Sequence, residues 1–120
     1  MNTRRGDEGA LPPVTWTAAA NRSWRELARF IEASPGGDAS ARRREIDLAI
    51  ELLRNTPLIG ERVEVRRGRE IRRIHVRRLV VYYIWRAGRD AAGVLSIRAV
   101  RHSAMERPFF GVRDSPQLPA

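Results

Sequence analysis

The sequence predicts an α+β fold in which a short first strand and two antiparallel helices are followed by a small antiparallel sheet, in the order β-α-α-β-β-β. Two segments between residues 18 and 55 place apolar side chains at helical spacing. Between residues 62 and 102, β-branched and aromatic runs alternate with arginine, as is typical of strands. A Thr-Pro pair at residues 56–57 separates these two halves. Because 120 residues suffice for one core, we expect a single domain over residues 13–110.

The first strand and helix follow a lead of residues 1–12, which is polar and which we expect to be disordered. The Val-Thr-Trp run at residues 14–16 favours a short strand, and Thr17 is placed to cap the helix after it. Over residues 18–33 apolar and charged positions fall on opposite faces of a helix. This predicts a buried stripe made of Ala20, Trp24, Leu27, Ala28 and Ile31.

A second helix is predicted after the Ser-Pro-Gly-Gly break at residues 34–37. Asp38 or Ser40 can cap it, and it should end near Asn55. An arginine triplet at residues 42–44 is unfavourable near a helix start, so a carboxylate of a partner protein or, more simply, solvent should hold it. We expect the helix to bury Ile46, Ala49, Ile50 and Leu53, with Leu48 and Leu52 widening the apolar face.

Three strands are predicted in the C-terminal half. Residues 62–76 predict one strand that Gly68 interrupts. Residues 79–85 are apolar on both faces, as expected of a central strand covered by helices on one side. Simple alternation over residues 94–102 places Arg98 and His102 together on one unpacked face. Residues 111–120 are expected to form a tail.

The positive charge is concentrated in the C-terminal half. The whole chain has a formal net charge of +9, and residues 62–78 alone hold eight Arg against two Glu. Such a density favours a polyanion or an acidic partner, and it predicts salt-sensitive association. Arg66, Arg67 and Arg69 also suit a solvated sheet edge that resists aggregation.

Composition excludes several kinds of chemistry. All 23 basic residues are Arg, so lysine Schiff-base chemistry is excluded. Without Cys, and with only two His at no ligand spacing, we expect no metal site and no cofactor. No apolar run reaches the length of a membrane span and no apolar signal core starts the chain, which favours a cytoplasmic protein.

A set of short motifs follows the order of the predicted elements. They are Val14-Thr-Trp16, Thr56-Pro57-Leu-Ile-Gly60, Arg72-Arg73-Ile74, Arg78-Leu-Val-Val-Tyr-Tyr-Ile84 and Val100-Arg-His-Ser-Ala104 with Arg107-Pro108. In this order they resemble the RelE/ParE family of toxins from bacterial type II toxin–antitoxin modules. The resemblance implies a cytoplasmic growth inhibitor that an antitoxin encoded beside it keeps silent. Some members cut mRNA in the ribosomal A site, and others poison DNA gyrase without a known catalytic residue.

The resemblance to the ribonuclease members implies catalytic positions at Arg73, Arg78 and His102, with Glu61 or Glu64 as a base. RNA cleavage by the 2′-OH needs a proton acceptor, a cation at the phosphorane and a proton donor. His102 is followed by Ser103 rather than by the aromatic residue of several ribonucleases, which is closer to gyrase-directed members. A structural hydrogen bond at a strand end is an equal interpretation of His102, so whether the chain is an enzyme stays open. Further contacts to the target or to nucleic acid are expected from Arg66, Arg67, Arg72, His75, Arg98 and Arg107.

Three functions remain as hypotheses: a ribosome-dependent mRNA endoribonuclease, a non-catalytic DNA gyrase poison and, least favoured, a non-toxic nucleic-acid-binding domain. Both toxin hypotheses require a cognate antitoxin. We expect that antitoxin to present an acidic, partly amphipathic segment that covers the helix groove and the arginine face. No membrane and no small-molecule ligand is expected as a partner.

Overall fold

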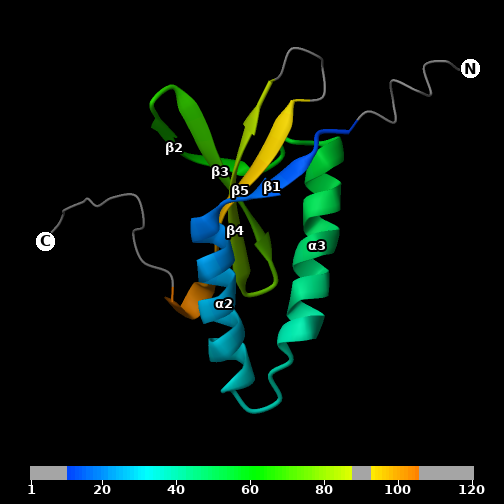
Figure 1. The fold of residues 1–120 in the computed structure, drawn as a ribbon, viewed down its shortest axis with the longest axis vertical. Helices are drawn as coiled ribbons and strands as arrows, with labels where there is room; N and C mark the ends of the chain where they lie inside the picture. The colour runs from blue at the N-terminus through cyan, green and yellow to red at the C-terminus, as the bar shows by residue number, and fades with distance from the viewer. Residues whose placement is uncertain (1–10, 88–92, 106–120) are drawn as a thin grey trace, which may run out of the picture.

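The computed structural model of the protein describes residues 11–87 and 93–105. Two helices form one layer against a five-stranded sheet, and a loop joins them at the bottom of the view (Figure 1). The predicted α+β class is confirmed. Arg107, the predicted tail and all but the last two residues of the predicted lead lie outside the described residues. The elements in order are β1 (Val14–Trp16), α2 (Ala18–Glu32), α3 (Ala39–Asn55), β2 (Glu61–Arg66), β3 (Arg69–Val76), β4 (Leu79–Arg86), β5 (Val94–His102) and the 3-10 turn η1 (Ser103–Met105).

Both helices begin at the predicted caps. The Thr17 side chain accepts a hydrogen bond from the Ala20 amide and donates one to the Ile97 carbonyl, which ties the start of α2 to β5. Asp38 accepts from the Ala41 amide at the start of α3. Two members of the arginine triplet have partners within the protein: Arg42 pairs with Glu45, and the Arg43 guanidinium lies 4.2 Å from the Trp16 ring centroid. Arg44 is exposed. Neither helix in the described part of the chain combines the length and apolarity needed to cross a membrane.

The sheet has the strand order β1-β5-β4-β3-β2, and β1 pairs with β5 in parallel while the other pairs are antiparallel. The sheet is therefore mixed rather than purely antiparallel. The stretch predicted as one interrupted strand over residues 62–76 is instead two strands, β2 and β3. Arg67 and Gly68 have φ of +54° and +76°, so the chain reverses there in the manner of a two-residue hairpin.

A β-bulge in β5 changes which side chains share a face. Tyr82 pairs with Ala99 and Tyr83 with Ile97, so Arg98 is the extra residue. As a result Leu95, Ile97 and Val100 pack toward the helices, whereas Ala99 packs on the other side. The prediction that Arg98 and His102 share a face was wrong, because simple alternation does not continue through a bulge.

The two faces of the sheet carry apolar clusters of different depth. The cluster under the helices includes Leu27, Ile46, Leu53, Val81, Tyr83 and Ile97. The cluster on the open face, which no described helix covers, is made of Ile71, Val80, Tyr82, Ile84 and Ala99 with Val63 beside it. The predicted wide apolar face of α3 was wrong at Leu48 and Leu52, whose exposed fractions are 72% and 57%. Leu48 and Leu52 belong to neither buried cluster, and Leu52 instead lines an open groove between α3 and β3.

Candidate functional site

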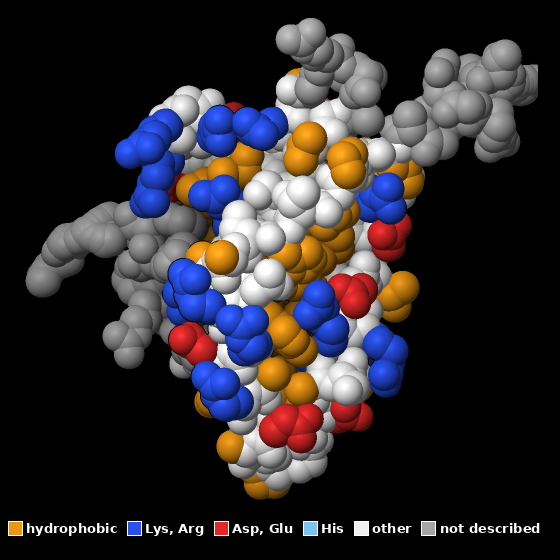
Figure 2. Space-filling view, in the orientation of Figure 1, with side chains coloured by type: hydrophobic (Ala, Val, Ile, Leu, Met, Phe, Trp, Pro, Cys, Tyr) orange, Lys and Arg blue, Asp and Glu red, His pale blue; other side chains and the backbone are white. Residues whose placement is uncertain are grey.

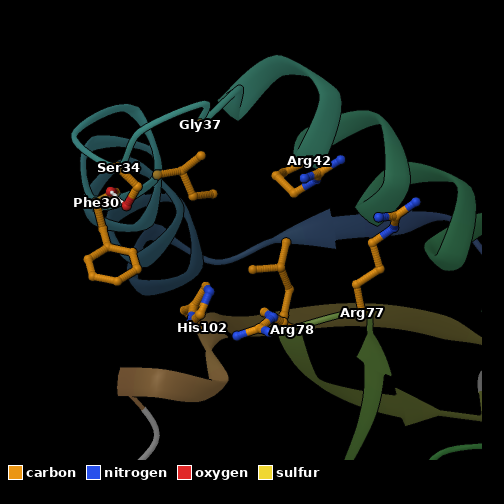
Figure 3. A pocket seen from close by; sticks show the side chains of 9 residues that line it. Phe30, Ser34, Gly37, Arg42, Arg77, Arg78 and His102 are labelled. Carbon is orange, nitrogen blue, oxygen red and sulfur yellow. Dashed lines mark hydrogen bonds between the residues drawn. The ribbon is translucent and has the colours of Figure 1, made fainter.

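A pocket on the helix side of the sheet contains two of the three candidate catalytic residues. It lies between the end of α2, the start of α3 and the β3–β4 turn, and its volume is about 300 Å³. Figure 3 shows Arg78 and His102 next to one another below Phe30 and Ser34, with Arg42 and Arg77 farther along the pocket. We call this hollow the hairpin pocket; its lining residues are Phe30, Ile31, Ser34, Gly37, Arg42, Arg77, Arg78, Leu79 and His102.

One carboxylate holds two of the arginines in the hairpin pocket. Glu45 of α3 lies with its oxygens 2.9 Å from Arg42 Nε and 3.1 Å from Arg77 Nε. Arg78 makes no ion pair with another described residue, although its carbonyl accepts from the Ser103 amide. The pocket therefore has one guanidinium available for a ligand.

His102 has one ring nitrogen already engaged. The Ala104 amide donates to His102 Nδ1 at 3.0 Å, so the proton of the neutral ring lies on Nε2. The ring centroid is 5.1 Å from that of Phe30, a tilted aromatic contact between β5 and α2. The interpretation of His102 as a hydrogen-bonding residue at a strand end thus has a direct structural basis.

A second arginine-lined hollow lies on the open face of the sheet, at the end where β2 and β3 turn. Its floor is made by Ile71 and Ile84, and its volume is about 460 Å³. We call it the arginine cradle, and its rim is made by Arg66, Arg67, Arg69 and Arg98. Figure 2 shows arginine side chains gathered at the upper left, where the β2–β3 hairpin lies in Figure 1. Three of the predicted target-binding residues, Arg66, Arg67 and Arg98, therefore lie together.

Arg73 belongs to the open face and is separated from the hairpin pocket by the sheet. It is paired in register with Tyr82, whose side chain lies in the open-face cluster. Its guanidinium donates to Glu61 at 3.0 Å. That hydrogen bond and one to Tyr82 raise the pKa of Arg73 above its already high ordinary value.

Arg72 and His75 have different environments from those of the other predicted contacts. Arg72 donates to the carbonyls of Leu58 and Gly60 and to Glu70, so it links β3 to the loop after α3. This makes Arg72 a structural residue of the hairpin base. His75 is exposed on β3, beyond the last residue pair between β2 and β3.

An apolar groove runs along α3 beside the uncovered end of β3. It has a volume of about 340 Å³ and is lined by Ala49, Leu52, Leu53, Ile59, Gly60, Glu61, Arg73, Ile74 and His75. Pairing of β2 with β3 ends at Glu61 and Arg73, so in the described part of the chain no strand borders residues 74–76 on that side. Leu58 and Ile59, both more than half exposed, continue the apolar surface.

Sequence reasoning missed several residues of these sites. Phe30 and Glu45 shape the hairpin pocket, and Leu58 and Ile59 extend the apolar groove. Glu45 could have been found from its position three residues after Arg42, which is a helical ion-pair spacing. In the described residues no group of three or more His, Asp or Glu side chains could hold a metal ion.

The comparison with protein families agrees with this architecture. The family model described as "ParE toxin of type II toxin-antitoxin system, parDE" matches residues 14–107, which span every strand and both long helices. No curated protein matches the chain. The family match covers well over half of the sequence, and the chain belongs to the ParE toxin family of type II toxin–antitoxin systems.

Proposed function

We propose that this toxin inhibits growth by binding DNA gyrase, without cutting RNA. Membership of the ParE toxin family supports a toxin that a cognate antitoxin silences. The observation that carries the choice of target is the position of Arg73, on the opposite side of the sheet from Arg78 and His102. The proposal places the action of the toxin in the bacterial cytoplasm, where gyrase works.

RNA cleavage would need its base, cation and acid at one phosphate. The two candidate bases, Glu61 and Glu64, lie on β2 and do not line the hairpin pocket. Glu61 accepts a hydrogen bond from Arg73, and Glu64 accepts one from Arg66. Glu45 lies against two of the pocket's arginines, and its oxygens are already paired with Arg42 and Arg77. The described residues around Arg78 and His102 therefore supply a cation and a proton donor but no uncommitted base.

The apolar groove suits the antitoxin better than it suits gyrase-bound DNA. Leu52, Ile59 and Ile74 offer apolar anchors for one face of an amphipathic segment, and the uncovered edge of β3 offers backbone groups. Arg73 and His75 beside them suit acidic side chains on the same segment. High salt should weaken the polar part of the toxin–antitoxin complex and leave the apolar part, so affinity measured at rising salt should fall and then level off.

The test is to add the full-length chain to purified gyrase with plasmid DNA, and separately to a translation reaction. We expect loss of supercoiling with gyrase-linked broken DNA, and intact mRNA by primer extension. A variant with Arg78→Gln and His102→Ala should retain most of this inhibition, because neither residue is assigned a chemical step.

The opposite result would be mRNA ends in phase with codons, lost in the double variant, with gyrase unaffected. That outcome would establish the ribonuclease hypothesis. A chain that affects neither gyrase nor mRNA would sink both toxin mechanisms, although family membership would stand.

A further inference from the structure

The tip of the β2–β3 hairpin carries arginines that local folding does not favour. Arg66 and Arg69 face one another across the hairpin, and like charges in that position destabilise a strand pair. Arg67 holds a positive φ at a turn position that usually takes Asn, Asp or Gly. The hairpin would close more readily with other residues, so these arginines call for an explanation beyond the fold.

Most of the charge in the arginine cradle is not neutralised within the protein. Arg66 donates to Glu64 at 2.9 Å. By contrast, Arg67, Arg69 and Arg98 form no ion pair or hydrogen bond through their guanidinium groups with any other described residue. On the other face of the same hairpin, Arg62 and Arg72 both reach Glu70. On that face the two arginines share a carboxylate, whereas three of the four cradle arginines have no acidic partner among the described residues.

The shape of the cradle matches a polyanion better than an acidic protein segment. Its cations come from both strands of the hairpin and from the bulge of β5, so they surround a hollow of about 460 Å³. An acidic protein segment also needs apolar anchors, which lie in the groove along α3. A two-stranded ribbon is narrow enough to enter the major groove of DNA, and guanidinium groups grip phosphate oxygens.

We propose that the arginine cradle binds the phosphate backbone of duplex DNA. Arg67, Arg69 and Arg98 supply the unneutralised cations, and Ile71 and Ile84 lie under them as the floor. The proposal rests on the proposed function for its biological setting, since gyrase holds a DNA duplex. The toxin would thus contact both the enzyme and its DNA.

The test is direct binding of the full-length chain to a fluorescent DNA duplex of about 30 base pairs, followed by anisotropy between about 50 and 200 mM salt. The cradle variant combines Arg67→Gln, Arg69→Gln and Arg98→Gln. The control variant combines Arg22→Gln, Arg25→Gln and Arg29→Gln, which are exposed on α2 and remove the same charge. Circular dichroism establishes that both variants fold.

We expect the cradle variant to bind DNA at least about tenfold more weakly, and the slope of log affinity against log salt to fall by about 2 to 3. The control variant should keep the slope of the unmodified chain within about 1. Equal losses in the two variants would overturn the proposal in favour of general charge attraction. Absence of DNA binding, or cradle-dependent binding of a poly-glutamate peptide without DNA binding, would also overturn it.

The proposal and the proposed function can fail separately. Binding of the cradle variant to gyrase in the absence of DNA tests the enzyme contact alone, and we expect it to be unchanged. If the chain binds duplex DNA through the cradle but never affects gyrase, the proposed function fails and the cradle stands. If the chain inhibits gyrase but the cradle variant binds duplex DNA as tightly as the unmodified chain, the proposed function stands and the cradle proposal fails.

Discussion

The hairpin pocket and the arginine cradle lie on opposite faces of one sheet and differ in what surrounds their arginines. In the pocket, Glu45 lies against two of the three arginines, and α2 and α3 form its walls. In the cradle, Glu64 lies against one of four, and no described helix covers the rim. Most of the arginine in the pocket is therefore neutralised by a carboxylate, whereas most of the arginine around the cradle is left available to a ligand. A basic sequence alone therefore does not locate a binding surface.

The largest expected difference between the faces is in packing. Ile97 is fully buried under the helices, whereas Ile84 lies in the thin cluster of the open face. Ile97→Ala should lower the free energy of unfolding by about 3 to 4 kcal/mol, and Ile84→Ala by about 2 kcal/mol. Urea unfolding of the two variants measures both. Equal losses would mean that the open-face cluster contributes as much to stability as the covered core.

Two adjacent tyrosines sharpen the comparison, because Tyr82 faces the open side and Tyr83 the helices. The Tyr83 hydroxyl accepts from the Gly60 amide at 3.0 Å and donates to the Pro57 carbonyl at 2.7 Å. Tyr83→Phe should therefore cost about 1 to 3 kcal/mol of unfolding free energy. Tyr82→Phe loses a hydrogen bond with Arg73 and should cost about 1 kcal/mol or less.

The same pair predicts a difference at alkaline pH. Burial raises the pKa of Tyr83 above its ordinary value of 10.0. The folded protein then keeps a proton that the unfolded chain loses, so stability should fall as pH rises above about 10. Thermal unfolding at a series of alkaline pH values should show a shallower fall in Tyr83→Phe than in Tyr82→Phe. Identical profiles would exclude Tyr83 as the titrating group.

A smaller effect is expected when the carboxylates that face arginine are neutralised. Glu45→Gln leaves Arg42 and Arg77 without their shared partner and should cost about 1 kcal/mol. Glu64→Gln affects only Arg66 at the hairpin tip and should cost about 0.5 kcal/mol or less. Chemical unfolding of the Glu45→Gln and Glu64→Gln variants at low and high salt measures both losses of unfolding free energy. A larger loss in Glu64→Gln would contradict the view that ion pairs contribute more to stability in the hairpin pocket than in the arginine cradle.

The smallest effect should appear at acid pH. Hydrogen bonds from Arg72 and Arg62 hold the pKa of Glu70 below its ordinary value of 4.5. The contribution of this carboxylate to the free energy of unfolding is fully present above the ordinary pKa. It is lost as the pH falls through the lowered pKa of the folded state. Glu70→Gln should flatten the acid side of a melting-temperature profile slightly, since the carboxylate is exposed. An unchanged acid side would show that other carboxylates determine it.

Local signals predicted much of the fold. Thr17 and Asp38 cap the helices as expected, because a cap depends on residues within one turn. The hairpin at Arg67 and Gly68 was missed, since one glycine inside a β-forming stretch predicts a bulge or an interruption as readily as a turn. The parallel pairing of β1 with β5 joins residues about 80 positions apart, and no local pattern encodes such a pairing.

The candidate sites were predicted less completely. Resemblance to known toxins led to Arg78 and His102, which the fold brings to one pocket, and to Arg73, which it does not. Alternation assigned Arg98 to the face of His102, and the bulge reversed this. The cradle could not be foreseen, because it combines a hairpin tip with a bulge from a strand that is not its neighbour in the sheet.

The parallel pairing of β1 with β5 also determines when the chain can complete its fold during synthesis. β1 leaves the ribosome before the other described strands and β5 after them, yet the two pair side by side in the finished sheet. Until Val94 and the residues after it emerge, β1 and the start of α2 have no strand to pack on. A ribosome that stops early therefore releases a chain without the strand that joins β1 to β4. Interrupted translation should yield incomplete chains for proteases to remove rather than partly active toxin.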